Sequence, residues 1–337
     1  MLPAILGICG TTLSDEERAF FREVEPAGHI LFKRNCVDRA QMLALTDDLR
    51  ALSGREDVPI LIDQEGGRVA RMQPPEWPAF PKAEVFDHLY EVAPITAIEA
   101  ARANAAAIGF TLKEVGVNVD CLPLLDVRQP GAHDIIGDRA LGSDPMRVAA
   151  LGRAVLDGLR DAGVVGVVKH MPGHGRALAD SHVELPTVDA EAQALESDLV
   201  PFHSLNKAVM GMTAHVVYAA WDAARCASVS PKVISEIIRG RIGFEGLLMS
   251  DDLGMQALAG DFTTRARDVV AAGCDVALHC SGNMEEMAHV AAGLGEVTAE
   301  GRARLERAMA SVAEVTPVTD YAECIEKRDA LLAVLRG

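Results

Sequence analysis

The stretch Val167–Pro186, VVKHMPGHGRALADSHVELP, carries the densest group of residues able to move protons or bind a metal ion. It contains His170, His174 and His182, and Asp180 lies two residues before the last of them. Three histidines can ligate a metal, and a carboxylate beside an imidazole can fix the tautomer of a histidine that gives and takes a proton. Both chemistries therefore have to be weighed.

The backbone of this stretch argues against the metal site. Histidines four residues apart share one face only on a helix, and Pro172, Gly173 and Gly175 prevent a helix between the first two histidines. The glycines also suit a loop that closes over a substrate. We therefore expect no metal and no cofactor, and we keep as an alternative a metal-dependent barrel hydrolase that uses His170, His174 and His182.

The elements that must position these residues follow from eight short apolar runs that alternate with helix-patterned segments, as in a parallel sheet. The runs are Ala4–Gly10, His29–Asn35, Pro59–Glu65, Val117–Val127, Val164–His170, Ala208–His215, Gly246–Asp252 and Asp275–Cys280. Eight such strands predict an α/β protein with a single (β/α)8 TIM-barrel domain over residues 1–337. An open doubly wound sheet is less favoured, because GICGTTLSDEE lacks the GxGxxG loop.

Three helical features support this pattern. Ser14 and Glu17 form a capping-box pattern at the start of one helix, and Ala97–Phe110 is an alanine-rich helix former. From about residue 284 the remaining helical segments are too short for a second sheet domain, so we expect them to cover the barrel.

Ionisable residues end several of the predicted strands, where barrel enzymes carry their chemistry. They include Asp63, Glu65, Arg68, Lys169, His170, His215, Asp251 and Asp252. Strand side chains alternate, so if Leu247 and Met249 fill the barrel, Asp251 points to its axis and Asp252 turns outward to cap the next helix. A buried aspartate can be a nucleophile, a base or a metal ligand, so this pair alone identifies no reaction.

Composition limits the possible partners. The chain of 337 residues is 49% hydrophobic and 24% charged, with a net charge of −17 and no basic cluster, which argues against nucleic acid and anionic membranes. No apolar run approaches the roughly 20 residues of a membrane-spanning helix, and no export signal is apparent. The seven scattered cysteines suggest reduced thiols, so we expect a cytoplasmic protein, monomeric by default.

Four motifs in the same order resemble family 3 glycoside hydrolases, in particular the single-domain bacterial β-N-acetylglucosaminidases of peptidoglycan recycling. They are DQEGGRVAR, IIGDRALG, KHMPGHG with the following ADSH, and SDDLGM. Two small departures are Met171, where the family more often has an aromatic residue, and Gly254, where serine is common. Neither touches the expected chemistry.

The resemblance implies a role for each matching residue. Asp251 is the expected nucleophile, His182 the acid/base and Asp180 the residue that orients it. The residues expected to bind sugar are Asp63, Arg71, Arg139, Lys169 and His170, while His174 supports the loop.

The resemblance also implies the reaction and substrate. We expect a retaining exo-β-N-acetylglucosaminidase that forms a covalent glycosyl-enzyme and cleaves N-acetylglucosaminyl-1,6-anhydro-N-acetylmuramyl peptides. A non-catalytic sugar-binding barrel is the remaining alternative, and the joint presence of Asp251, Asp180 and His182 argues against it.

Overall fold

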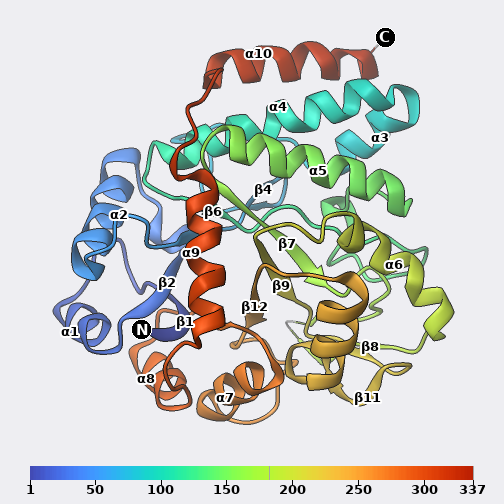
Figure 1. The fold of residues 1–337 in the computed structure, drawn as a ribbon. Helices are drawn as coiled ribbons and strands as arrows, with labels where there is room; N and C mark the ends of the chain where they lie inside the picture. Colours follow the sequence, from blue (N-terminus) through green and yellow to red (C-terminus); the bar gives the residue numbers. More distant parts are fainter. Residues whose placement is uncertain (182, 337) are drawn as a thin grey trace.

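Eight parallel strands close into a barrel in the computed structural model of the chain, which describes residues 1–181 and 183–336 (Figure 1). In barrel order they are β1 (Leu2–Gly7), β2 (Pro26–Leu31), β3 (Ile60–Ile62), β6 (Val119–Asp120), β7 (Val165–Met171), β9 (Met210–Thr213), β12 (Leu247–Asp252) and β13 (Val276–His279). Each overlaps one of the eight predicted runs, so the (β/α)8 prediction is confirmed.

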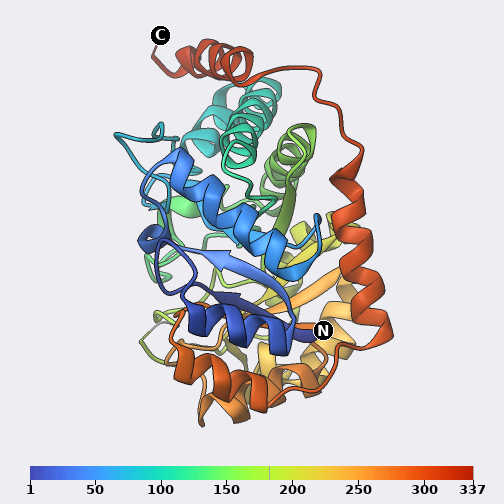
Figure 2. The same cartoon turned by 90° about the vertical axis from the view of Figure 1, so that its left-hand side faces the viewer.

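Helices connect successive strands and form the outer layer (Figures 1 and 2). They are α1 (Asp15–Val24), α2 (Arg39–Ser53), α3 (Glu84–Val92), α4 (Pro94–Lys113), α5 (Pro145–Asp161), α6 (Ala192–Ser204), a π-helical segment (Val233–Ile242) and α7 (Phe262–Ala272). The predicted capping box is present, because Ser14 and Glu17 each accept the other's backbone N–H. The alanine-rich segment forms most of α4.

Two predicted strands are shorter than expected. The third ends at Ile62, and the residues after Asp63 turn into a hairpin of β4 (Gln64–Gly66) and β5 (Val69–Ala70). The fourth pairs only over Val119–Asp120, with one later bridge between Leu124 and Lys169. Pro123 has no N–H to give to a ladder, which fits the early end of this strand.

A small three-stranded sheet is formed by the chain between β7 and β12. It consists of β8 (Thr187–Val188), β10 (Val217–Tyr218) and β11 (Asp222–Cys226), joined in the order β11, β10, β8. Because β8 follows the histidine-rich stretch directly, this sheet fixes the far end of that segment.

Three helices follow the last barrel strand, namely α8 (Met284–Ala292), α9 (Ala299–Ala313) and α10 (Tyr321–Leu332). Leu305, Ala308 and Met309 of α9 belong to the same buried cluster as the side chains inside the barrel. Arg304 of α9 pairs with Asp275, just before β13, so α9 closes the amino-terminal end of the barrel. Figure 1 shows α9 crossing that end. The last helix, α10, packs on α4 at the top of the same view.

The described residues contain no helix long and apolar enough to cross a bilayer. All seven cysteines are free thiols, and five of them are buried.

Candidate active site

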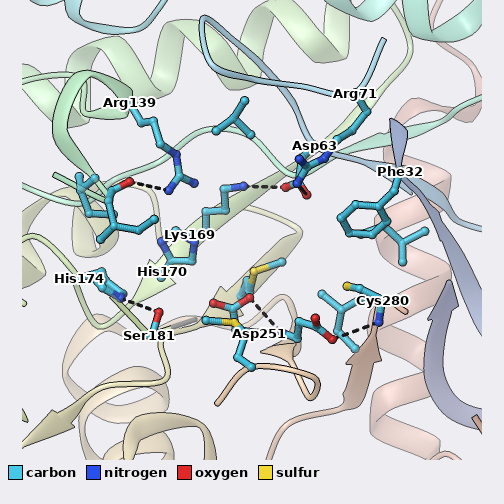
Figure 3. A pocket seen from close by; sticks show the side chains of 18 of the residues that line it. Phe32, Asp63, Arg71, Arg139, Lys169, His170, His174, Ser181, Asp251 and Cys280 are labelled. Carbon is cyan, nitrogen blue, oxygen red and sulfur yellow. Dashed lines mark hydrogen bonds and ion pairs between the residues drawn. The ribbon is translucent and has the colours of Figure 1, made fainter. Parts of the chain in front are cut away.

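A cavity of about 230 Å³ opens at the carboxyl-terminal ends of the barrel strands. Its lining includes six of the residues predicted to act on or bind substrate: Asp63, Arg71, Arg139, Lys169, His170 and Asp251. They come from four barrel strands or the segments that follow them, and Figure 3 shows them around one space. The barrel therefore brings together residues that are up to 188 positions apart, from Asp63 to Asp251.

Asp251 lies where the alternation along β12 predicts. Leu247 and Met249 belong to the interior cluster of the barrel, and Asp251 continues that face into the cavity. Its Oδ1 accepts the backbone N–H of Asp252 at 2.8 Å. A carboxylate is thus held at the cavity floor below Lys169 and His170 (Figure 3).

Asp252 differs from the prediction that it caps the next helix. Its Oδ1 accepts the backbone N–H groups of Gly254 at 3.0 Å and Cys280 at 3.1 Å, and it too lines the cavity. The N-cap of α7 is instead Asp261. The chain turns sharply after β12, so Asp252 is used to hold the strand ends of β12 and β13 together.

Lys169 is the centre of a buried charge network. Its Nζ lies 2.9 Å from Oδ1 of Asp63 and 2.7 Å from Oε1 of Glu65. The other oxygen of Asp63 accepts a hydrogen bond from Arg71 at 2.9 Å. Arg139 donates to both carboxylate oxygens of Glu65, at 2.8 and 2.9 Å. Two carboxylates and three cations are therefore locked in a fixed arrangement on one wall.

This pairing keeps the charges of the network. Burial alone would raise the pKa of Asp63, but Lys169 and Arg71 outweigh it and lower that pKa. Burial likewise opposes the charge on Lys169, yet Asp63 and Glu65 raise its pKa. The wall therefore presents charged groups that are held in place by their own ion pairs.

A second carboxylate, Asp126, holds the start of the histidine-rich segment. Its Oδ2 lies 2.8 Å from Nδ1 of His170, and its Oδ1 accepts the backbone N–H groups of His170 at 3.2 Å and His174 at 2.6 Å. Burial raises the pKa of Asp126, but His170 outweighs it and brings the pKa to about 2. The Nδ1 of His170 is thus committed to Asp126, which leaves Nε2 for a ligand.

The segment after β7 is tightly packed where the sequence suggested mobility. A Cβ on Gly175 would lie 1.9 Å from the carbonyl oxygen of Val127, so glycine is required there by close backbone approach. Tyr218 donates to the carbonyl of Gly173 at 2.8 Å. The start of this loop is therefore anchored to the barrel.

The remaining part of the loop reaches the cavity through Ser181. Its Oγ lies 3.2 Å from Nε2 of His174, and both residues line the cavity, in keeping with the supporting role expected of His174 (Figure 3). Asp180 is half-buried, and its carbonyl accepts the N–H groups of Val183 and Glu184. The predicted acid/base, His182, lies outside the described residues.

Apolar side chains also line the cavity. They include Ile30, Phe32, Met212 and Leu278. Phe32 lies beside the charged network, with its ring centre 4.8 Å from the guanidinium of Arg71. A ligand with one polar edge and one apolar face, such as a sugar ring, suits this arrangement.

Two of the three histidines of the metal alternative are described, and the third, His182, lies outside the described residues. His170 and His174 meet edge to face, with ring centres 5.7 Å apart, and each already has a hydrogen-bond partner. Within residues 1–181 and 183–336, no group of three or more His, Cys, Asp or Glu side chains is placed to hold a metal ion.

Sequence reasoning assigned no role to Glu65 or Asp126. Glu65 lies inside the DQEGGR motif, and Asp126 ends the predicted fourth strand, so the rule that strand ends carry chemistry could have found both. Their partners could not be found in this way, because they are distant in the sequence. Arg139 is 74 residues from Glu65, and His170 is 44 residues from Asp126.

Comparison with known proteins identifies the family of the chain. The model of the glycosyl hydrolase family 3 N terminal domain matches residues 5–318. A β-hexosaminidase of Aromatoleum aromaticum is 37% identical over 309 residues, 90% of this chain and 86% of the relative. A β-hexosaminidase of Alkalilimnicola ehrlichii is 41% identical over 284 residues, 83% of this chain and 80% of the relative.

Solved structures give the same result. Native NagZ from Neisseria gonorrhoeae superposes with a TM-score of 0.86 at 29% identity, covering 98% of this chain and 97% of NagZ. The same protein in complex with N-trifluoroacetyl-D-glucosamine gives a TM-score of 0.85 at 28% identity, with the same coverage. The chain therefore belongs to glycosyl hydrolase family 3, among its β-N-acetylhexosaminidases.

Proposed function

We propose that this protein is a retaining exo-β-N-acetylglucosaminidase that removes terminal β-linked N-acetylglucosamine from peptidoglycan fragments. The observation that carries the proposal is the position of Asp251, whose carboxylate enters the same cavity as the Asp63, Lys169 and Arg71 network. A nucleophile placed beside fixed polar groups can attack a sugar that those groups hold in place.

In the proposed first step, Asp251 attacks the anomeric carbon and the bond to the leaving oxygen breaks. His182, protonated and oriented by Asp180, gives its proton to that oxygen. In the second step His182 takes a proton from water, which attacks the anomeric carbon and releases Asp251. Ser181, which precedes His182 in the sequence, lines the cavity.

The charged wall would bind the hydroxyl and acetamido groups of the sugar. Asp63 accepts hydrogen bonds, while Arg71, Lys169 and Arg139 donate them. A cavity of about 230 Å³ lies below the range of roughly 300–1,000 Å³ of pockets for drug-sized ligands, so it suits one sugar unit. This supports cleavage at the end of a chain and not within it.

The sugar preference is supported by the NagZ complex with N-trifluoroacetyl-D-glucosamine, an N-acylated glucosamine. The peptide-bearing anhydromuramyl aglycone rests on the resemblance of the four motifs, the cytoplasmic location rests on the seven scattered cysteines, and the monomeric state is the default expectation. They form the finer part of the proposal.

The direct experiment compares p-nitrophenyl N-acetyl-β-glucosaminide with the matching β-glucoside. We expect turnover of the first with a clear preference over the second, and release of the β-anomer by early time-point NMR. Saturable binding without product would support a non-catalytic barrel, and an α-anomer as first product would contradict the retaining mechanism.

A covalent trap tests the nucleophile. A mechanism-based 5-fluoro glycoside of N-acetylglucosamine should label the peptide that contains Asp251, as read by mass spectrometry after proteolysis. The Asp251→Asn variant should remain unlabelled, and labelling of any other carboxylate would contradict the assignment.

A further inference from the structure

A second cavity lies at the opposite end of the barrel from the candidate active site. Its volume is about 330 Å³, larger than the cavity at Asp251. Its walls come from the end of α1, the end of α2 with the loop that follows, and α9. Figures 1 and 2 both show the amino terminus between α1 and α9, where this cavity is found.

The charges around this cavity are one-sided. Arg22, Arg55 and Arg302 line it, and Glu25 is the one acidic side chain among the described lining residues. The carboxylate of Glu25 lies 3.7 Å from the amino group of Met1. Among the ion pairs between described residues, none joins an acid to any of the three arginines within 4.0 Å. The cavity is therefore lined mainly by cations, although the whole chain has a net charge of −17.

Arg55 is fixed in place without a counterion. Its Nη2 donates to the carbonyl oxygens of Pro26 at 3.1 Å and Ala27 at 3.0 Å. Burial lowers the pKa of Arg55, and the positive charge of Arg302 lowers it further, against the opposing effects of Asp57 and Glu25. Two guanidinium groups that disfavour each other's charge are stabilised by an anion placed between them.

His29 adds a buried polar group to the same cavity. Its side chain is buried against Phe21, with ring centres 4.8 Å apart, and its Nδ1 has no hydrogen-bond partner among the described residues. Burial and then Arg55 lower the pKa of His29 to about 3, so the ring is neutral. An enclosed polar atom without a partner is costly in a folded protein and calls for a ligand or water to satisfy it.

We propose that this second cavity binds a small molecule through an oxyanion group, a phosphate or a carboxylate, held by Arg22, Arg55 and Arg302. Guanidinium forks match the geometry of both groups, and the volume admits a molecule the size of a sugar phosphate or a dicarboxylic acid. The side chains of Phe21 and His29, which also line the cavity, would contact the rest of the ligand. The proposal does not depend on the reaction at Asp251.

Isothermal titration of the full chain with inorganic phosphate and, separately, with succinate tests the proposal and distinguishes the two oxyanions. Saturating N-acetylglucosamine is added to occupy the barrel cavity, and sodium chloride at matched ionic strength serves as the salt control. We expect saturable binding of at least one oxyanion. Absence of saturable binding for both oxyanions overturns the proposal.

A pair of matched variants locates the site. Arg302→Glu reverses the charge of an exposed residue at the cavity, and should weaken binding at least tenfold without unfolding the protein. Arg267→Glu makes the same charge change on exposed α7, outside the cavity lining, and should leave affinity within twofold. Equal weakening by both variants, or unchanged affinity in Arg302→Glu, overturns the assignment to this cavity.

Discussion

Oδ2 of Asp126 lies 2.8 Å from Nδ1 of His170, and the other oxygen of Asp126 holds the backbone of His174. One buried carboxylate thus sets both the His170 ring, which lines the cavity, and the start of the loop that leads to His182 in the sequence. The sugar site and the proposed proton donor share this support.

Asp126→Asn should lower kcat/KM by roughly 10–100-fold, because an amide cannot accept all three of the hydrogen bonds that the carboxylate accepts. Since His170 loses its charged partner, the pH dependence of kcat/KM should change as well. Steady-state kinetics across pH measures both effects. Asp48→Asn, a surface variant in an ion pair with Arg18, is the matched control. A folded Asp126→Asn enzyme with an unaltered pH profile would show that this contact is only structural.

Asp251→Asn should reduce turnover by a factor on the order of 10³ or more while sugar binding persists, because it removes the proposed nucleophile but little volume. Asp252→Asn should retain most activity, since an amide oxygen can still accept from Gly254 and Cys280. Kinetics and sugar titration of the two variants are compared directly. The assignment is wrong if Asp252→Asn is the inactive one.

His182→Ala should impair cleavage of substrates with poor leaving groups far more than that of activated aryl glycosides, because only the former need protonation. Chitobiose and p-nitrophenyl N-acetyl-β-glucosaminide form a suitable pair. Asp180→Asn should show the same pattern with a smaller loss. Equal losses on the two substrates in His182→Ala would rule out the acid/base role.

Glu65→Gln should destabilise the fold by about 3 kcal/mol, because it removes the carboxylate that pairs with the buried cations Lys169 and Arg139. Its side chain is 5% exposed, so water cannot replace the lost partner. Urea unfolding measures the change. The double variant Glu65→Gln with Arg139→Gln should be less destabilised than the sum of the single variants, and strict additivity would show that the pair is not coupled.

Asp120→Asn should change how stability depends on pH. Burial raises the pKa of Asp120 from 3.8 to about 8, and its Oδ2 has no hydrogen-bond partner among the described residues. Between about pH 4 and 8 the folded protein therefore holds a proton that the unfolded chain releases, so the free energy of unfolding falls as pH rises.

Asparagine removes that dependence and still offers an oxygen to the backbone N–H of Gln64. The stability of Asp120→Asn relative to the parent protein should thus increase with pH, by at most about 1.4 kcal/mol per unit. Urea unfolding at pH 5 and pH 8 measures this difference. A difference that is the same at both values contradicts the prediction.

The barrel could be predicted from sequence because each strand is a short apolar run and helix-patterned segments separate the runs. The alternation of side chains along β12 was enough to predict that Asp251 points into the barrel. The strand of Val117–Val127 was overestimated because its apolar run continues to Val127, whereas regular ladder pairing ends at Asp120. Apolar character reports burial, and burial continues there after the strand has ended.

The site was predicted only in part. The motif residues at strand ends could be listed, but Glu65 and Asp126 act through partners that lie far away in sequence. Asp252 was predicted to cap the following helix, because local sequence rules favour an aspartate there. In the closed barrel its carboxylate instead accepts the backbone N–H of Cys280 on the neighbouring strand end. Such choices depend on which strands become neighbours, and this is known only once the barrel is closed.

The closure of one barrel end by α9 has a consequence for turnover. With that end filled by Leu305, Ala308 and Met309, the aglycone, the incoming water and the freed sugar must all pass through the same mouth, in that order. Departure of the first product is then a condition for the second half of the reaction, and free N-acetylglucosamine should act as a competitive product inhibitor.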